Sequence, residues 1–210
     1  MIAPPMKQPS TRRGTETKEH IVACAAELIH ERGVSATTVD DVLAASRAGK
    51  SQFYHYFDSK EQLVREVLRH NLDCALAAQE ALIENLSTWK GIKAWLDALA
   101  DTHERAGLFG GCRIGSLAAE MAERDEELRV AIAAAFASWE SFLAAGLEAM
   151  KARGALRPSA KPDVLAETTM AAIQGGYLLS TTKKDVRPMR NALAAAYTHL
   201  RSFRRPTPAS

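Results

Sequence analysis

Apolar residues recur along most of the chain at the three- and four-residue spacing of amphipathic helices. The first such stripe lies within residues 15–32, and Gly33 follows it at a position where helices commonly end. No comparable stretch alternates apolar and polar residues as a half-buried strand would. The same reasoning predicts further helices over residues 37–45, 49–57, 59–85, 87–106, 110–123, 125–153, 163–182 and 187–203. The sequence therefore predicts an all-α protein of about nine helices.

Residues 37–57 combine two short predicted helices with a tight connection, the pattern of a helix-turn-helix. Thr37 or Thr38 can cap the first helix, and Gly49 stands where the second begins. A short helix buries one face only, so Phe53 and Phe57 should point inward. Their neighbours in the aromatic run, Tyr54 and His55, should then point outward.

The net charge of +2 is too small to indicate a nucleic-acid partner by itself. Basic residues do gather before the first helix, in a proline-containing stretch read as a disordered arm over residues 1–14. Two readings of Arg12 and Arg13 stay open: part of a simple tail, or contacts to a minor groove or phosphate.

Chemistry-bearing motifs are scarce. The three cysteines are widely spaced and form no Cys-x-x-Cys pair, which favours neither a disulfide framework nor a zinc site. Catalytic and nucleotide-binding signatures are lacking, so neither an enzyme nor a cofactor is expected. No run of eighteen apolar residues suggests a membrane span, and a cytoplasmic location is expected. An enzyme or carrier built around a helical pocket remains the rival reading.

The block TTVDDVLAAS…GKSQFYHYFDSKEQLV, within a match over about residues 15–68, closely resembles the DNA-binding half of the tetracycline-repressor (TetR) family of bacterial regulators. The resemblance implies a three-helix DNA-binding domain over residues 15–60 and a helical effector-binding and dimerisation domain over 61–204, followed by a tail at 205–210. It implies a ligand-responsive repressor that binds a palindromic operator as a homodimer. An activator or nucleoid-type binder of the same fold is the alternative.

The resemblance and the chemistry of the side chains together select the candidate DNA contacts. Thr38 and Lys60 resemble phosphate contacts of the family, Tyr54 and His55 resemble its recognition-helix pair, and Gln52 occupies a base-reading position. Amide and amine groups at a helix start suit adenine, guanine or phosphate. The full set is Thr37, Thr38, Arg47, Lys50, Ser51, Gln52, Tyr54, His55 and Lys60. Relatives commonly carry glycine where this chain has Arg47, so either Arg47 adopts an unusual backbone conformation or the turn is built differently.

The second half of the chain is rich in large rings and sulfur-containing side chains, which suit a pocket for a small apolar or electrophilic effector. The candidate lining residues are Trp95, His103, Phe109, Cys112, Trp139 and Tyr177.

The segment Gly111-Cys112-x-x-Gly115 is similar to one found in a branch of the family in which some members sense electrophiles or oxidants with the cysteine. A thiol at a helix start beside Arg113 could have a lowered pKa and react readily. The alternative is a small structural cysteine at a tight helix start. Thr181 stands where that branch often has lysine or arginine, which weakens the comparison.

The last two predicted helices carry the candidate dimer interface. The resemblance implies that they pair with their copies in a four-helix arrangement. The residues assigned to it are Gly175, Gly176, Leu179, Leu193, Ala196 and Leu200. An intramolecular core is the alternative.

Overall fold

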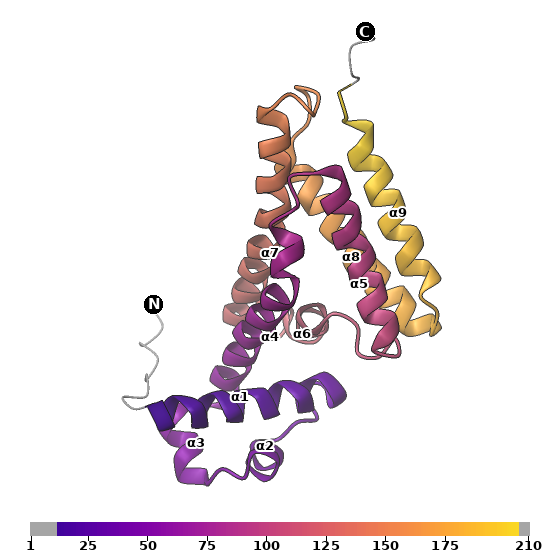
Figure 1. Cartoon of the computed structure of the whole chain (residues 1–210). Coiled ribbons are helices and arrows are strands. Elements are labelled where there is room, and N and C mark those ends of the chain that lie inside the picture. Colours follow the sequence, from indigo (N-terminus) through magenta and orange to yellow (C-terminus); the bar gives the residue numbers. More distant parts are fainter. Residues whose placement is uncertain (1–11, 206–210) are drawn as a thin grey trace. The chain divides into compact units, whose positions relative to one another are not determined.

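The computed structural model describes residues 12–205, and within them it contains nine α-helices and no strand beyond one isolated β-bridge between Leu156 and Arg204 (Figure 1). This confirms the predicted all-α class. The helices are α1 (Arg12–Arg32), α2 (Val39–Ser46), α3 (Lys50–Tyr56), α4 (Lys60–Ile83), α5 (Trp89–Arg105), α6 (Arg113–Met121), α7 (Glu126–Ala152), α8 (Pro162–Lys183) and α9 (Arg187–Ser202).

The described chain forms two compact units, and neither is continuous in sequence. The N-terminal unit comprises residues 12–74 and 116–132, and the C-terminal unit comprises 75–115 and 133–205. Helices α4, α6 and α7 therefore each belong partly to both units. The functional boundary expected at residue 60 remains a prediction.

The N-terminal unit packs α1 across α2 and α3, as Figure 1 shows. Ile21, Phe53 and Phe57 are completely buried, as the inward assignment of the two phenylalanines predicted. Helix α1 begins at Arg12, earlier than expected, and an ion pair between Arg12 and Glu16 lies in its first turns. The remainder of the predicted arm, residues 1–11, lies outside the described residues, as do residues 206–210 of the tail.

The C-terminal unit is built on α5, α8 and α9, with α8 and α9 packed side by side (Figure 1). Two glycines let helices approach the turn after α4 closely. A Cβ at Gly91 would lie 1.9 Å from the Asn85 carbonyl oxygen, and one at Gly146 would lie 2.6 Å from the Leu86 carbonyl oxygen. Only glycine fits at either position, so both α5 and α7 are anchored against the backbone of this turn.

Helix α7 is long and apolar enough to cross a membrane by length and composition alone. Its apolar face is buried in the protein, with Leu128, Ile132, Trp139, Leu143 and Leu147 each at most 3% exposed. Of the apolar window of α7, 33% is buried inside the protein, and a single helix of this length and composition is weak evidence for a membrane span.

Candidate DNA-binding surface and effector-site cluster

The helix-turn-helix closes through a left-handed residue at the end of α2. Arg47 has φ 54° and ψ 26°, which is the αL conformation that glycine adopts most readily. This decides between the two alternatives for the missing glycine: the turn keeps its geometry, and Arg47 takes the unusual backbone conformation. The side chain of Arg47 is exposed.

Thr38, and not Thr37, caps α2. The Thr38 hydroxyl oxygen accepts from the Asp41 amide at 3.1 Å, and the Asp41 carboxylate accepts from the Thr38 amide at 2.8 Å. This reciprocal capping box satisfies amides at the helix start. The hydrogen bonds from the Thr38 side chain and backbone lower the pKa of Asp41.

Thr37 was wrongly assigned to the DNA surface. Its side chain is 2% exposed, and its hydroxyl donates to the Gly33 carbonyl oxygen at 2.8 Å. The hydroxyl is therefore used to close the turn between α1 and α2, and it is not available to a phosphate.

Helix α3 presents a polar face to solvent. Lys50, Ser51, Tyr54 and His55 are all exposed, while Phe53, Tyr56 and Phe57 are buried behind them. The outward prediction for Tyr54 and His55 is confirmed, with Tyr54 49% exposed.

Gln52 is exposed, but its side chain also forms a hydrogen bond within α3. Its side-chain oxygen accepts from the Gly49 amide at 3.0 Å and closes the capping box of α3. The amide nitrogen is left to donate to a base, whereas two-point recognition of adenine would require the cap to open.

Lys60 is also engaged within the protein. Its ammonium donates to the Val34 carbonyl oxygen at 2.6 Å, and an ammonium has further donors for a phosphate. Beside the helix-turn-helix, a hollow of about 320 Å³ lies between α1 and the turn, and Arg13, His20, Arg47 and Gln52 are among its lining residues. The lining carries two arginines against one carboxylate, that of Glu16, so its formal charge is positive.

Polar groups from three segments meet inside the C-terminal unit. His103 on α5 is 3% exposed, and its Nε2 lies 3.3 Å from the hydroxyl of Thr181 on α8. The ring of Tyr177, one turn earlier on α8, meets the His103 ring edge-on at a centroid distance of 4.9 Å. Burial, reinforced by the charge of Lys184, lowers the pKa of His103, so the imidazole is neutral at pH 7.

Cys112 joins this group and caps α6. Its Sγ accepts from the Gly115 amide at 3.4 Å, and its thiol is hydrogen-bonded to Gln174. Burial raises the pKa of the Cys112 thiol. This is the reverse of the lowered pKa expected for a reactive cysteine, because a helix start and Arg113 do not outweigh desolvation here. We refer to His103, Cys112, Gln174, Tyr177 and Thr181 as the effector-site cluster, because three of them are predicted ligand-binding residues; that role remains a prediction.

The other candidate ring residues lie apart from this cluster or have partners of their own. The Trp95 indole donates to Gln79 at 2.7 Å. Phe109 is 50% exposed, and the Lys184 ammonium lies over its ring. The same ammonium donates a hydrogen bond to the Leu108 carbonyl oxygen at 3.0 Å. Trp139 is 3% exposed, and its indole nitrogen has no hydrogen-bond partner among residues 12–205.

Four of the six residues assigned to the dimer interface are buried within their own chain, which corrects that assignment. Leu193, Ala196 and Leu200 are at most 7% exposed, and a Cβ at Gly176 would lie 3.1 Å from Met189 on α9. The α9 stripe is apolar because it packs inside the chain. Gly175 and Leu179 remain accessible, since nothing lies within 4 Å of a Cβ at Gly175 and Leu179 is 47% exposed.

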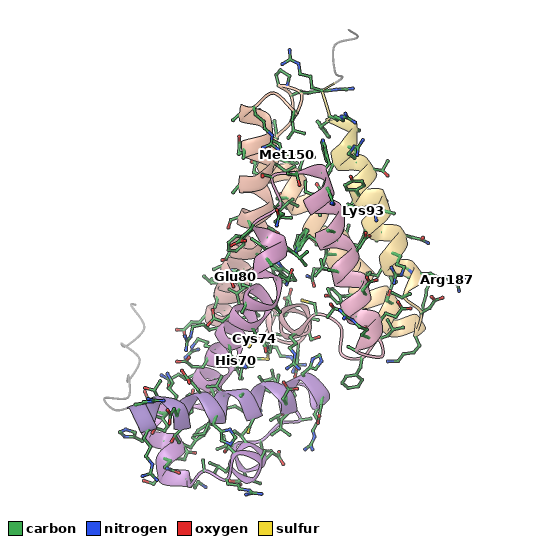
Figure 2. The ribbon with its side chains drawn as sticks, in the orientation of Figure 1. His70, Cys74, Glu80, Lys93, Met150 and Arg187 are labelled. Atoms are coloured by element: carbon green, nitrogen blue, oxygen red, sulfur yellow. The ribbon has the colours of Figure 1, made fainter. Side chains whose placement is uncertain are left out.

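Side-chain pairs also occur outside these sites. His70 and Cys74 lie next to each other on α4, with the sulfur 3.6 Å from the ring nitrogen Nε2 (Figure 2). His20 and Cys24 form the same pair on α1 at 3.8 Å. No group of three or more metal-ligating side chains occurs among residues 12–205.

Sequence reasoning missed two partners of the effector-site cluster, Gln174 and Thr181. In the sequence, Thr181 stood out only as a departure from a family pattern, and no role was assigned to Gln174. The spacing of Gln174, Tyr177 and Thr181 at three and four residues places them on one face of α8, and this signal could have identified them.

Comparison with known proteins agrees with this architecture. Residues 21–67 match the model described as bacterial regulatory proteins of the TetR family, and residues 88–195 match the C-terminal domain model of LmrA/YxaF-like transcriptional regulators. An uncharacterised helix-turn-helix regulator of the lacX 3′ region of Lactococcus lactis subsp. lactis is 30% identical over 178 residues, covering 81% of this chain and 86% of the relative. The repressor DhaR of Mycobacterium sp. (strain GP1) is 25% identical over 189 residues, covering 89% and 93%.

Among solved structures, a TetR regulator from Chloroflexus aurantiacus J-10-FL superimposes with a TM-score of 0.78 at 28% identity, covering 94% of this chain and all of that one. The fold and the helix-turn-helix define a DNA-binding transcription regulator. The chain belongs to the TetR family of bacterial transcriptional regulators, which are not enzymes.

Proposed function

We propose that this protein is a ligand-responsive repressor that binds a palindromic operator as a homodimer. The observation that carries the proposal is the exposed polar face of α3, which the αL turn at Arg47 presents in helix-turn-helix geometry. A recognition helix reads bases with residues near its N-terminus, and that is where Lys50 and Ser51 lie.

The proposed DNA contacts fall into two groups, contacts to base edges and contacts to backbone phosphates. Lys50, Ser51, His55 and the amide nitrogen of Gln52 are assigned to base edges. The phosphate contacts are assigned to Thr38, Arg47, Tyr54 and Lys60, whose donors carry no sequence information. The Thr38 hydroxyl donates to the Asp41 carboxylate at 2.6 Å, and it has to leave this partner to reach a phosphate, whereas the exposed position of Thr38 gives it access that the buried Thr37 lacks. The hollow between Arg13 and Arg47 supports a phosphate position beside the turn.

The proposed dimer surface is a stripe of small and apolar residues on α8. It runs through Val164, Thr168, Ala171, Gly175, Leu178 and Thr182, which follow each other at three- and four-residue steps. The hydroxyls of Thr168 and Thr182 each donate to the carbonyl four residues earlier, so both threonines can turn methyl groups outward. Leu178 is 68% exposed, which is unusual for a leucine and fits burial against a second copy.

The proposed effector is a small molecule with an apolar body and one polar group. In the effector-site cluster, a neutral imidazole, a threonine hydroxyl and a phenol supply both donors and acceptors without a fixed charge. These groups suit a carbonyl, hydroxyl or amide better than a carboxylate. A bacterial cytoplasmic location is proposed with this role.

A reactive-thiol sensor is the second candidate, and the Gly-Cys-x-x-Gly segment favours it. The raised pKa of Cys112 opposes it. Mild N-ethylmaleimide treatment followed by peptide mass spectrometry discriminates the two: a sensor is labelled at Cys112 before Cys24 and Cys74. A structural Cys112 reacts after Cys74, because Cys74 is exposed and Cys112 is partly buried.

Operator binding is tested with a duplex selected by the protein from random oligonucleotides, with fluorescence anisotropy at several salt concentrations. Lys60→Ala should weaken binding to all duplexes alike and reduce the salt slope by about one. Ser51→Ala should mainly relax the base preference. An enzyme or carrier would show no salt-dependent duplex binding, and that result would reject the proposal.

A further inference from the structure

Two segments of the C-terminal unit that are distant in sequence lie against each other, and both carry only basic charges (Figure 1). Residues 151–161, at the end of α7 and in the link to α8, contain four Lys and Arg residues and no Asp or Glu. Residues 199–205, at the end of α9, contain three Arg residues and no Asp or Glu. Without these seven side chains the chain would have more acidic than basic residues. A large share of its excess basic charge is therefore concentrated in these two segments.

Backbone hydrogen bonds hold the two segments together as a short antiparallel pair. Leu156 and Arg204 form the β-bridge between them, and Leu156 is only 2% exposed. Hydrogen bonds flank this bridge on both sides, from the Arg157 amide at 2.8 Å and from the Arg205 amide at 3.0 Å, to carbonyl oxygens of the opposite segment. Because backbone groups make the pairing, the arginine side chains are not needed to maintain it.

Five basic side chains of these segments are exposed. They are Arg153, Arg157, Lys161, Arg204 and Arg205, and we call them the basic patch. None of the five forms an ion pair within residues 12–205, whereas six other arginines in that range do. Arg205 extends back toward the first segment, since a Cβ added to Gly154 would lie 3.7 Å from a guanidinium nitrogen of Arg205. Two arginines without counter-charges are thereby brought close together.

The edge of the basic patch is attached to the turn between α4 and α5. Arg153 donates a hydrogen bond to the Ser87 carbonyl oxygen. Nearby, the Arg201 guanidinium lies 5.2 Å from the centre of the Trp89 ring and donates to the Tyr197 hydroxyl at 3.2 Å. A guanidinium has five N–H donors, so both arginines keep donors for a further acceptor.

The stability of the C-terminal unit does not explain this cluster of cations. Like charges repel each other, and a surface that only keeps a protein soluble usually carries both signs interspersed. The basic patch has one sign, and its side chains lack carboxylate partners in the chain. A partner that supplies negative charge would relieve the repulsion, and the exposed guanidinium groups are accessible to it.

The chemistry of the basic patch favours the phosphates of a nucleic acid as that partner. Four of its five residues are arginines, whose planar guanidinium group binds a phosphate through two parallel hydrogen bonds. A protein interface has an apolar core, and a membrane-inserting surface carries large apolar side chains. The exposed large apolar residues of the described chain all lie outside the two segments. Interfaces with DNA, in contrast, are polar and strongly basic.

We infer that the basic patch is a second DNA-contacting surface, which binds the phosphate backbone of duplex DNA without reading its sequence. It belongs to the C-terminal unit, whereas the helix-turn-helix belongs to the N-terminal unit. Binding by the basic patch requires no operator, so the inference goes beyond the repressor function proposed above and does not depend on it.

The test isolates the basic patch from the helix-turn-helix. Full-length protein carries Arg47→Glu and Lys50→Glu, which reverse two charges on the proposed operator-binding surface. Fluorescence anisotropy measures its affinity for a short duplex of arbitrary sequence at several salt concentrations. Binding should persist in this background protein and should weaken as salt is added, because the basic patch is intact.

The decisive variant adds Arg157→Gln, Arg204→Gln and Arg205→Gln to the background protein. Each phosphate contact contributes about 0.9 to the slope of log affinity against log salt concentration, so the slope should become shallower by about 2.7. Lysine at the same three positions should keep the slope of the background protein, because lysine also neutralises a phosphate. A slope that stays unchanged in the glutamine variant overturns the inference.

The matched control removes the same charge from the same unit, with Arg105→Gln, Arg187→Gln and Arg190→Gln in the background protein. Arg187 and Arg190 are paired with carboxylates, and Arg105 donates to a backbone carbonyl oxygen. The control should keep the slope of the background protein. An equal loss of slope in the control and in the glutamine variant would mean that only net charge matters, and it would overturn the inference.

Thermal melting of the glutamine variant should match that of the control, because the bridge between the segments is made by backbone groups. Vesicles containing phosphatidylserine serve as the alternative polyanionic surface. Binding of the background protein to these vesicles but not to the duplex would overturn the inference in favour of a lipid surface. Failure of the unmodified protein to select an operator would overturn the proposed function alone, since the duplex of arbitrary sequence still tests the basic patch.

Discussion

A buried ion pair fastens α1 to α4, and removing one partner should be far more harmful than removing both. The Lys18 ammonium lies 2.6 Å from Glu66 Oε1, and the two side chains are only 10% and 2% exposed. Arg69 also reaches Glu66 at 2.6 Å, but it is 62% exposed and contributes less because solvent screens it. The perturbations are Glu66→Met, Lys18→Met and the double variant.

The expected magnitude follows from desolvation. Glu66→Met leaves the Lys18 ammonium buried without its counter-charge, which costs about 3 kcal/mol of stability of the N-terminal unit, the lower end for broken buried pairs. Lys18→Met should cost less, because Arg69 still partners Glu66. The double variant replaces the pair with apolar side chains and should lie within about 1 kcal/mol of the wild type.

Native-state hydrogen exchange read by mass spectrometry measures this change locally. Peptides from α1 report the N-terminal unit, and peptides from α8, in the other unit, serve as the internal control. The single variants should lower protection in α1 and leave α8 unchanged. If the double variant is instead destabilised by the sum of the two single costs, within about 0.5 kcal/mol, the two side chains act as independent sites and the ion pair does not couple them.

Glu66 and Glu120 both have pKa values below the ordinary 4.5, because hydrogen-bonded and charged partners outweigh burial. The stability that these two carboxylates contribute is therefore present above pH 4.5 and is lost as the pH falls below it. Thermal melting followed by circular dichroism from pH 7 to 3 should show this loss, and melting temperatures that stay constant below pH 4.5 would contradict it. Gly91→Ala should destabilise the protein by several kcal/mol, since the new methyl group meets the Asn85 backbone, whereas Ala98→Gly on the same helix should cost about 1 kcal/mol. Leu178→Glu should convert the dimer to a monomer in analytical ultracentrifugation and weaken operator binding, and a dimer that persists would remove the α8 stripe from the interface.

The local pattern of the sequence predicted much of the N-terminal unit. Helical spacing placed Phe53 and Phe57 inside and Tyr54 and His55 outside, because a seven-residue helix can bury only one face. The sequence also showed that Arg47 stands where relatives commonly carry glycine, although only the backbone angles showed that this arginine takes the αL conformation. These features depend on residues within a few positions of each other, and the sequence displays such relations directly.

Tertiary structure alone decided the relations between distant segments. The sequence could not show that Thr37 turns inward to Gly33, or that the apolar stripe with Leu193 packs inside its own chain, since an apolar stripe looks the same against a partner as against the core. Nor could it pair Glu120 with Ser35, eighty-five residues away. In the sequence Glu120 is one of several acidic residues on a helix, and it acquires a role because folding brings two unpaired amides to its carboxylate. Proximity of this kind is created by the packing of helices, and no periodicity in the chain encodes it.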